Sequence, residues 1–177
     1  MNMMTKATML LLVLGTAACT NPDRLGGGAG GVGGDGTGVG LGAGGIIAGS
    51  ANDPTSPAYF SQAIGDRVLF AVDTSTLTPE GQRILDGQVQ WLLTNADYRA
   101  VIEGHADEQG TREYNLALGA RRANAVREYL VSRGVPSSRL EVISYGKLRP
   151  IEVCSNEACY AKNRRAVTVL SFSAITS

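Results

Sequence analysis

Neither sign of charge is in excess in this chain, which carries 16 lysines and arginines against 16 aspartates and glutamates in 177 residues. It therefore lacks the basic surplus that steers proteins toward nucleic acid or acidic membranes. Histidine and tryptophan each occur once, and there are three cysteines. So few reactive groups leave little material for a metal site or an activated nucleophile. Composition thus favours a binding or structural protein, and we expect no enzyme, no cofactor, no metal and no nucleic-acid partner.

Long apolar runs are also missing, since none approaches the roughly 20 residues that span a bilayer. A short apolar run, Met9 to Leu14, follows the single charge of Lys6, and small residues occupy positions 16–18. This order predicts an export signal over residues 1–18. Cys19 follows directly, as in a bacterial lipoprotein lipobox, although Thr16 stands where an aliphatic residue is usual. We expect Cys19 to be acylated and to anchor the chain; the alternative is an ordinary cleavage site followed by a chance cysteine.

Glycine is concentrated in one segment, because 14 of the 23 glycines lie between Gly26 and Gly49. Such a segment has too few side chains to repay the entropy of ordering its backbone. We therefore predict a flexible tether over residues 19–63 and a folded domain over residues 64–177. The alternative is a glycine zipper, in which small residues let apolar helices pack closely in lipid.

The remaining sequence alternates between short extended segments and helical ones. Thr78-Pro79-Glu80 is a helix start, with a capping hydroxyl, a proline in the first turn and an acid near the positive helix end. Gly134 and Pro136 end a second helix that Thr111 begins. Strands separated by long helices imply some parallel pairing, so we predict an α/β fold with a mixed four-stranded sheet. The expected strands are 67–73, 99–107, 140–145 and 164–172, and the expected helices are 78–93, 111–133 and a short helix or turn at 156–163.

One strand–helix junction carries the informative polar residues. Asp107 ends a predicted strand, and ligands of open α/β sheets bind at that edge. Asn115, Leu118 and Arg122 share one stripe of the following helix, which should face the sheet. A buried arginine there needs a carboxylate, because an unpaired buried charge is costly. Two interpretations stay open: Asp107 and Arg122 form a structural ion pair, or they receive the ammonium and the carboxylate of a zwitterion.

Three segments carry a family resemblance: EGHADEQGTREYNLALGARRANAVREYL, then SYGKLRP, then KNRRAV. They closely resemble the OmpA-like peptidoglycan-binding domain, in particular its lipid-anchored members, and the match runs from about Val68 to Leu170. The resemblance implies a β-α-β-α-β-(α)-β fold. It also implies an outer-membrane lipoprotein, held at the periplasmic face by its acylated cysteine, that binds peptidoglycan without a covalent bond. Such proteins tie the outer membrane to the cell wall and contact the Tol system in envelope integrity and cell division.

The resemblance further implies a pocket for diaminopimelate, a zwitterionic side group of the wall peptide. The residues that fall on the family's binding positions are Asp73, Asp107, Asn115, Leu118 and Arg122. This chain departs from the family where Val72 replaces an aromatic residue at the pocket rim. The resemblance leaves the role of Arg164 open.

Two smaller features have competing interpretations. Glu103, His105 and Asp107 alternate along one strand and could form a metal or acid–base cluster, but the lone histidine is expected instead to be hydrogen-bonded in place. Cys154 and Cys159 are spaced for a disulfide, which an oxidising envelope compartment permits. The competing functional hypotheses are an enzyme acting on the wall and an assembly protein that oligomerises through its glycine-rich segment.

Overall fold

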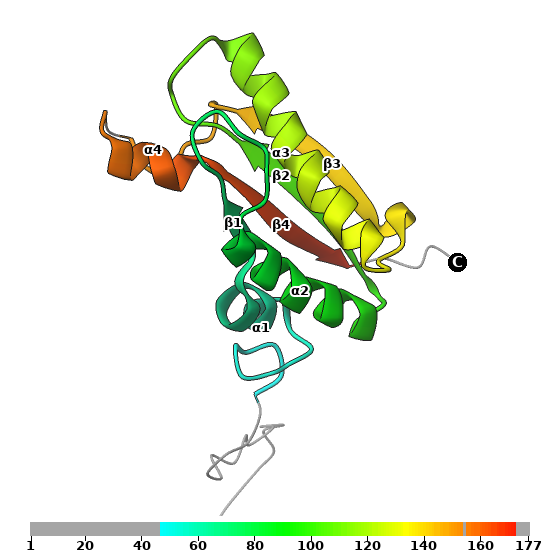
Figure 1. Ribbon diagram of the computed structural model, residues 1–177. Helices are drawn as coiled ribbons and strands as arrows, with labels where there is room; N and C mark the ends of the chain where they lie inside the picture. The colour runs from blue at the N-terminus through cyan, green and yellow to red at the C-terminus, as the bar shows by residue number, and fades with distance from the viewer. Residues whose placement is uncertain (1–46, 154, 173–177) are drawn as a thin grey trace, which may run out of the picture. The chain divides into compact units, whose positions relative to one another are not determined.

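The computed structural model describes residues 47–153 and 155–172, which build a sheet with helices packed on it (Figure 1). The predicted export signal, the predicted acylation site Cys19, most of the glycine-rich segment and Cys154 lie outside these residues. No helix in the described part of the chain is long and apolar enough to cross a membrane.

The strands form one mixed sheet, in agreement with the predicted fold class. Its order is β1-β4-β2-β3, with β2 and β3 parallel and β4 antiparallel to both of its neighbours. The strands are β1 (Arg67–Leu69), β2 (Tyr98–His105), β3 (Leu140–Gly146) and β4 (Arg165–Phe172). The helical elements are α1 (Pro57–Tyr59), the π-helix η1 (Phe60–Gly65), α2 (Pro79–Thr94), α3 (Arg112–Ser132), the 3-10 helix η2 (Ser137–Arg139) and α4 (Glu157–Asn163).

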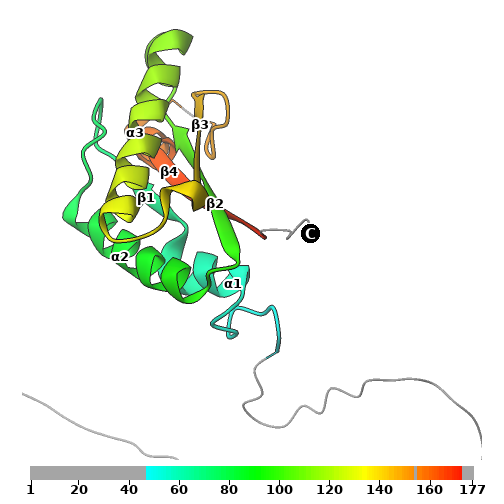
Figure 2. The ribbon, with the colours of Figure 1, turned by 90° about the vertical axis from the view of Figure 1, so that its right-hand side faces the viewer.

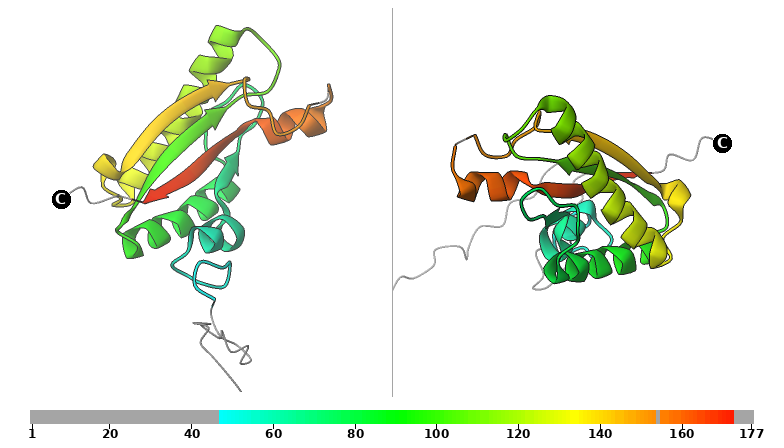
Figure 3. Two further views of the ribbon diagram at one scale, coloured as in Figure 1. Left: turned by 180° about the vertical axis from the view of Figure 1, so that it is seen from behind. Right: turned by 45° about the horizontal axis from the view of Figure 1, so that its top comes forward.

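Helices α2 and α3 cover one face of the sheet and enclose the hydrophobic core (Figure 2). Both begin as predicted: the Thr78 hydroxyl accepts a hydrogen bond from the backbone of Gly81 at 3.0 Å, and that of Thr111 from Tyr114 at 3.2 Å. Seen from behind, the opposite face has no helix of the described residues over it (Figure 3). The sheet is therefore packed from one side, and the stripe of α3 that was predicted to face the sheet does so.

Helix α3 lies unusually close to β2 because two glycines meet there. A methyl group on Gly104 would come within 1.8 Å of the Gly119 carbonyl oxygen. The Ser144 hydroxyl of β3 donates to the Leu116 carbonyl at 2.6 Å and fixes the same half of the helix. The N-terminal half of α3 is thereby held against the ends of β2 and β3, where the polar residues cluster.

Two predicted strands end earlier in the structure, for local reasons. The first ends at Leu69 because Phe70 turns into the core and Asp73 adopts a positive φ of 55°. The second ends at His105, where the pairing with β3 shifts register. Asp107 therefore lies just beyond a strand end.

Packing on the domain begins before residue 64. Phe60 is buried in the core, and the Trp91 indole donates to the Pro54 carbonyl at 2.7 Å. These contacts come from single aromatic residues and prolines, which produce no hydrophobic period along the sequence.

Candidate functional site

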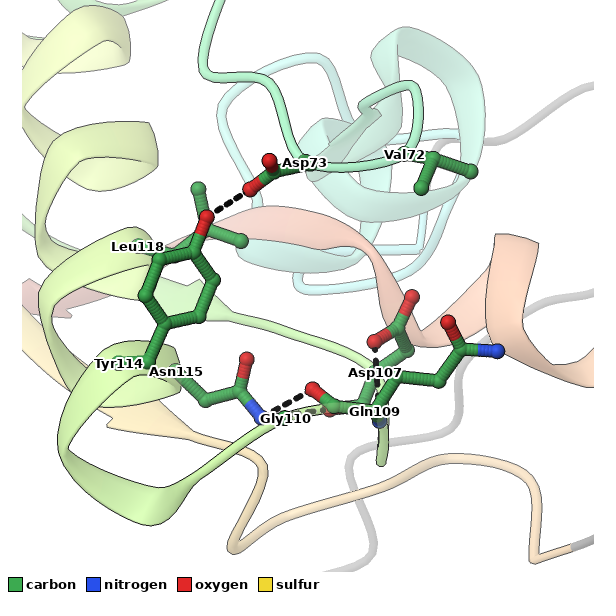
Figure 4. Close-up of a pocket in the computed structure, with 8 residues that line it drawn as sticks. All are labelled: Val72, Asp73, Asp107, Gln109, Gly110, Tyr114, Asn115 and Leu118. Carbon is green, nitrogen blue, oxygen red and sulfur yellow. Dashed lines mark hydrogen bonds between the residues drawn. The ribbon is translucent and has the colours of Figure 1, made fainter.

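A pocket of about 260 Å³ opens between the loop after β1 and the start of α3. Val72 and Asp73 lie on one side of it, and Asp107, Gln109 and Gly110 lie on the other (Figure 4). Tyr114, Asn115 and Leu118 of α3 form the wall between them. Four of the five residues assigned to peptidoglycan thus line one pocket: Asp73, Asp107, Asn115 and Leu118.

Asp107 is the buried acid of the pocket, with 8% of its surface exposed. One carboxylate oxygen accepts a hydrogen bond from the Gln109 backbone at 3.2 Å, and the other faces the Arg164 guanidinium at 3.2 Å. The ion pair considered from the sequence therefore forms with a different arginine, because Arg164, between α4 and β4, is the nearer cation. The carboxylate still reaches the pocket surface.

Asn115 holds the loop that follows Asp107. Its amide nitrogen donates to the Gln109 carbonyl at 2.7 Å and to the Asp107 carbonyl at 3.3 Å. Its amide oxygen is directed away from that loop, toward the middle of the pocket (Figure 4). Asn115 can therefore offer an acceptor to a ligand while it fixes the acid's backbone.

Arg122 lies on α3, one turn after the pocket residue Leu118, and is fully buried, with 0% of its surface exposed. Its three donor groups reach the carbonyls of Thr74, His105 and Ala71 at 2.8, 2.8 and 3.1 Å. The expectation that it needs a carboxylate is wrong for this structure, because the end of β2 and the loop after β1 supply three carbonyl dipoles instead. Arg122 does not line the pocket.

The charge of Arg122 is nevertheless felt in the site. Burial lowers its pKa to about 10, and Arg164 opposes the charge, whereas Asp107 and Asp73 favour it. At neutral pH the guanidinium stays protonated, since its pKa remains well above 7. The pocket therefore has an acid in its wall and a buried cation whose charge interacts with that acid, which are the two charges that a zwitterion requires.

The loop after β1 closes the pocket from the other side. Asp73 accepts a hydrogen bond from the Tyr114 hydroxyl, which joins this loop to α3 (Figure 4). This contact raises the pKa of Tyr114. Val72, beside Asp73, is half exposed at the rim and offers only a small apolar surface.

His105 is not hydrogen-bonded in place, contrary to expectation. Neither ring nitrogen has a hydrogen-bond partner in the described structure, and burial lowers the pKa of the ring to about 4, with Arg165 and Arg149 adding to the shift. The Glu103 carboxylate lies 3.7 Å from the ring, but the ring is neutral at physiological pH and makes no ion pair. The ring instead stacks on Tyr145.

Among residues 47–153 and 155–172, no group of three or more histidine, cysteine, aspartate or glutamate side chains is placed to hold a metal ion. Cys159 is buried in α4, while Cys154 lies outside the described residues. The disulfide between these two cysteines stays a prediction.

Sequence reasoning missed four residues that shape the site. Gln109, Gly110 and Tyr114 line the pocket, and Lys147 donates to the Gly110 carbonyl at 2.7 Å from the end of β3. Only Gly110 carried a signal, because a glycine between a strand and a helix indicates a turn, and its φ is +92°. The others act through contacts between distant segments.

Comparison with known proteins agrees with this geometry. The OmpA family model matches residues 69–164. A peptidoglycan-associated lipoprotein of Rhizobium meliloti (strain 1021) is 48% identical over 161 residues, which cover 91% of this chain and 84% of the relative. One from Mesorhizobium japonicum is 55% identical over 127 residues, covering 72% of this chain and 76% of the relative.

Solved structures match as well. The crystal structure of the peptidoglycan-associated lipoprotein from Burkholderia pseudomallei has a TM-score of 0.61 and 38% identity, and the match covers 68% of this chain and 98% of that one. The family and these relatives are structural proteins rather than enzymes, in line with the prediction that this chain is not an enzyme. The chain belongs to the OmpA family, and its relatives within that family are peptidoglycan-associated lipoproteins.

Proposed function

We propose that the protein is an outer-membrane lipoprotein that binds peptidoglycan without a covalent bond and ties the outer membrane to the cell wall. Acylated Cys19 is the membrane anchor in this proposal, and the segment up to about residue 63 is the tether. The names of the relatives support an envelope lipoprotein that associates with peptidoglycan. By family resemblance, the Tol system is the protein partner in envelope integrity and cell division.

The observation that carries the proposal is the pairing of charges at the pocket. The free end of diaminopimelate bears an ammonium and a carboxylate on one carbon, so it needs an acid and a cation a short distance apart. Asp107 is the acid, and buried Arg122 is the cation, which acts through its electrostatic field. Asn115 adds a polar acceptor and Leu118 an apolar wall for the methylene chain, while Asp73 bounds the other side.

Arg122 is assigned a specific part in this binding. Direct contact with the ligand carboxylate requires the guanidinium to exchange one of its three carbonyl bonds. Such an exchange is favourable where it replaces a dipole by a full opposite charge, because hydrogen bonds between ions are about twice as strong as neutral ones. Without the exchange, the cation still attracts the carboxylate through the low dielectric of the domain.

Sedimentation with purified cell-wall sacculi tests the proposal. The mature wild-type chain is expected to sediment with sacculi and to be released by free diaminopimelate. Asp107→Asn keeps the shape but removes the charge and replaces one of the two acceptor oxygens by an NH2 donor, and it should abolish sedimentation while leaving the far-ultraviolet spectrum unchanged. Glu113→Gln, an exposed acid on the first turn of α3 that does not line the pocket, is the matched control and should sediment normally.

Undiminished sedimentation of Asp107→Asn, or a failure of diaminopimelate to compete, would overturn the assigned pocket. Release of soluble wall fragments during the incubation would instead support the enzyme hypothesis. A separate test addresses the anchor: Cys19→Ser should free the protein from membranes, whereas removal of residues 26–49 should not. The opposite result would favour membrane insertion of the glycine-rich segment.

A further inference from the structure

Arg164 is clamped between two carboxylates, one in the pocket and one outside it. Its guanidinium faces Asp107 at 3.2 Å and also donates to Glu157 of α4. The third donor group reaches the Phe70 carbonyl at 3.3 Å. The Arg164 and Asp107 side chains are 6% and 11% exposed, whereas that of Glu157 is 66% exposed. The exposed acid Glu157 therefore binds the buried Arg164, which also binds the pocket acid Asp107.

The summed charge of Asp107, Arg164 and Glu157 decides which ligand groups the pocket attracts. Asp107 and Arg164 alone would cancel, and a neutral pair attracts an ammonium group weakly. Glu157 adds a second negative charge and leaves the group with a net charge of −1. Burial lowers the pKa of Arg164, but its hydrogen bonds and charge interactions with Glu157 and Asp107 outweigh this effect and raise the pKa above its usual value. Arg164 is therefore always a cation, and its pull on Asp107 is permanent.

We propose that Glu157 is a positioning residue for the binding site that acts through Arg164. It shares the guanidinium charge with Asp107 and so leaves part of the negative charge of Asp107 uncompensated and able to attract a cationic ligand group. The inference rests on the proposed function, since it names a residue that tunes the ammonium subsite of that pocket. Glu157 itself does not line the pocket.

The structure fixes Glu157 in the place that this role requires. Glu157 is the first residue of α4, where the Asn156 side chain caps the helix by accepting from the Cys159 backbone at 3.1 Å. At the other end of α4, Asn163 donates to the Glu108 carboxylate at 2.9 Å, so the helix is tied to the residue next to Asp107. Arg164 follows directly. Helix α4 thus sets the distance between the two acids that share the arginine.

Calorimetry with a defined ligand tests the inference. The probe is the tripeptide L-Ala-γ-D-Glu-meso-diaminopimelate, titrated into the mature full-length chain in detergent. Glu157→Gln should weaken binding about three- to tenfold, the range expected for a partly exposed ion pair that acts at one remove. Glu157→Asp keeps the charge and should recover most of the affinity.

A second ligand separates an electrostatic role from a structural one. The same tripeptide with the distal amine replaced by hydrogen has no ammonium for Asp107 to bind. Its affinity should be lower in wild type and unchanged by Glu157→Gln, whereas a distorted pocket would bind both peptides less well. Glu152→Gln is the matched control, because this exposed acid in the preceding loop pairs with Lys162 at 2.9 Å and is not among the partners of Arg164.

Equal affinity of wild type and Glu157→Gln for the diaminopimelate tripeptide would overturn the inference and leave the proposed function intact. So would an equal loss for both peptides, or an equal effect of Glu152→Gln. Failure of the wild-type chain to bind the tripeptide at all would overturn the proposed function and the inference together.

Discussion

Two buried arginines lie near the pocket acid, and the domain satisfies them in opposite ways. Arg164 is held by two carboxylates, Asp107 and Glu157, together with one carbonyl. Arg122 is held by three carbonyls, and no ion pair within the described residues includes it. Carbonyl dipoles satisfy the hydrogen-bonding capacity of a guanidinium, but they do not cancel its net charge.

In the proposed function, this difference would let one small site receive both ends of a zwitterion. Around Arg164 the acids outnumber the cation, so that side of the pocket favours an ammonium. Around Arg122 the cation is uncompensated and favours a carboxylate. A direct ion pair between Asp107 and Arg122 would have neutralised both sides, so the separation of the two arginines keeps both charges available.

Loss of Arg122 should have the largest effect. Arg122→Met fills the space but leaves three buried carbonyls without a donor, one at the end of β2 and two in the loop after β1, and we expect a loss of at least about 3 kcal/mol in the free energy of unfolding. Urea denaturation measures this directly. Arg121→Met is the matched control. It replaces the exposed arginine just before Arg122 and should change the free energy of unfolding by less than about 0.5 kcal/mol.

Arg122→Lys separates charge from geometry at the same position. Lysine keeps the cation but cannot span three carbonyls at once. We expect intermediate stability and weak sacculus binding. If Arg122→Met were as stable as wild type, the carbonyl clamp would have no structural value, and the contrast between the two arginines would fail.

Low pH should lower the free energy of unfolding through His105. The backbone carbonyl of this residue accepts a hydrogen bond from Arg122. The pKa of His105 is about 4 in the folded chain and 6.5 in the unfolded one, so the unfolded state binds more protons between these values. Stability is therefore complete above about pH 6.5 and falls as the pH drops toward 4, by at most about 3 kcal/mol. Urea denaturation of wild type at pH 7 and pH 4.5 should reveal the loss.

A His105→Phe chain provides the comparison, since it retains a buried ring that cannot be protonated. Its stability should change less than that of wild type over the same pH interval. An identical pH dependence in both chains would assign the acid sensitivity to other groups, such as the carboxylates around Arg164.

The sequence predicted the four strands, the helices α2, α3 and α4 and the pocket edge, because those depend on local patterns, but it did not predict the short elements α1, η1 and η2. Thr78 and Thr111 indicate the starts of two helices as N-cap residues. The spacing of Asn115 and Arg122 places both on the buried stripe of α3. Asp107 was assigned to the sheet edge from its place between a strand and a helix. All of these inferences use neighbours within about three turns of helix or one strand.

The partners of the two arginines were beyond such reasoning. Asp107 and Arg164 are 57 residues apart in the chain, and Arg122 bonds to carbonyls 17, 48 and 51 residues away. Every residue has a backbone carbonyl, so the sequence does not show which carbonyls will face an arginine. Their direction here depends on a loop in which Asp73 takes a positive φ. The nearest charged partner along a motif is therefore a poor guide to the partner in space.

Lys147, like Arg122, is a cation held by backbone carbonyls, but it has two of them rather than three. Its ammonium donates to the carbonyls of Gly110 and Glu108, at 2.7 and 3.4 Å, but it lies nearer the surface. Lys147→Met should therefore cost only about 1 kcal/mol of stability, because water can replace the lost bonds. Sacculus binding should fall a few-fold as the Gly110 loop loosens. A loss as large as that of Arg122→Met would mean that burial is not what distinguishes the two clamps.

The smallest effect is expected at the rim, where neither arginine acts. Val72 is 54% exposed beside the pocket, and Val72→Phe would lay an aromatic face along the apolar methylenes of a bound diaminopimelate. Burying part of that surface should tighten tripeptide binding about threefold, with no change in its salt dependence. Val169→Phe, on the uncovered face of the sheet and 41% exposed, is the matched control and should leave affinity unchanged. A gain from Val72→Phe that disappears with added salt would mean that the rim changes the balance between the two arginines, whereas a salt-independent gain keeps apolar contact and charge recognition as separate contributions.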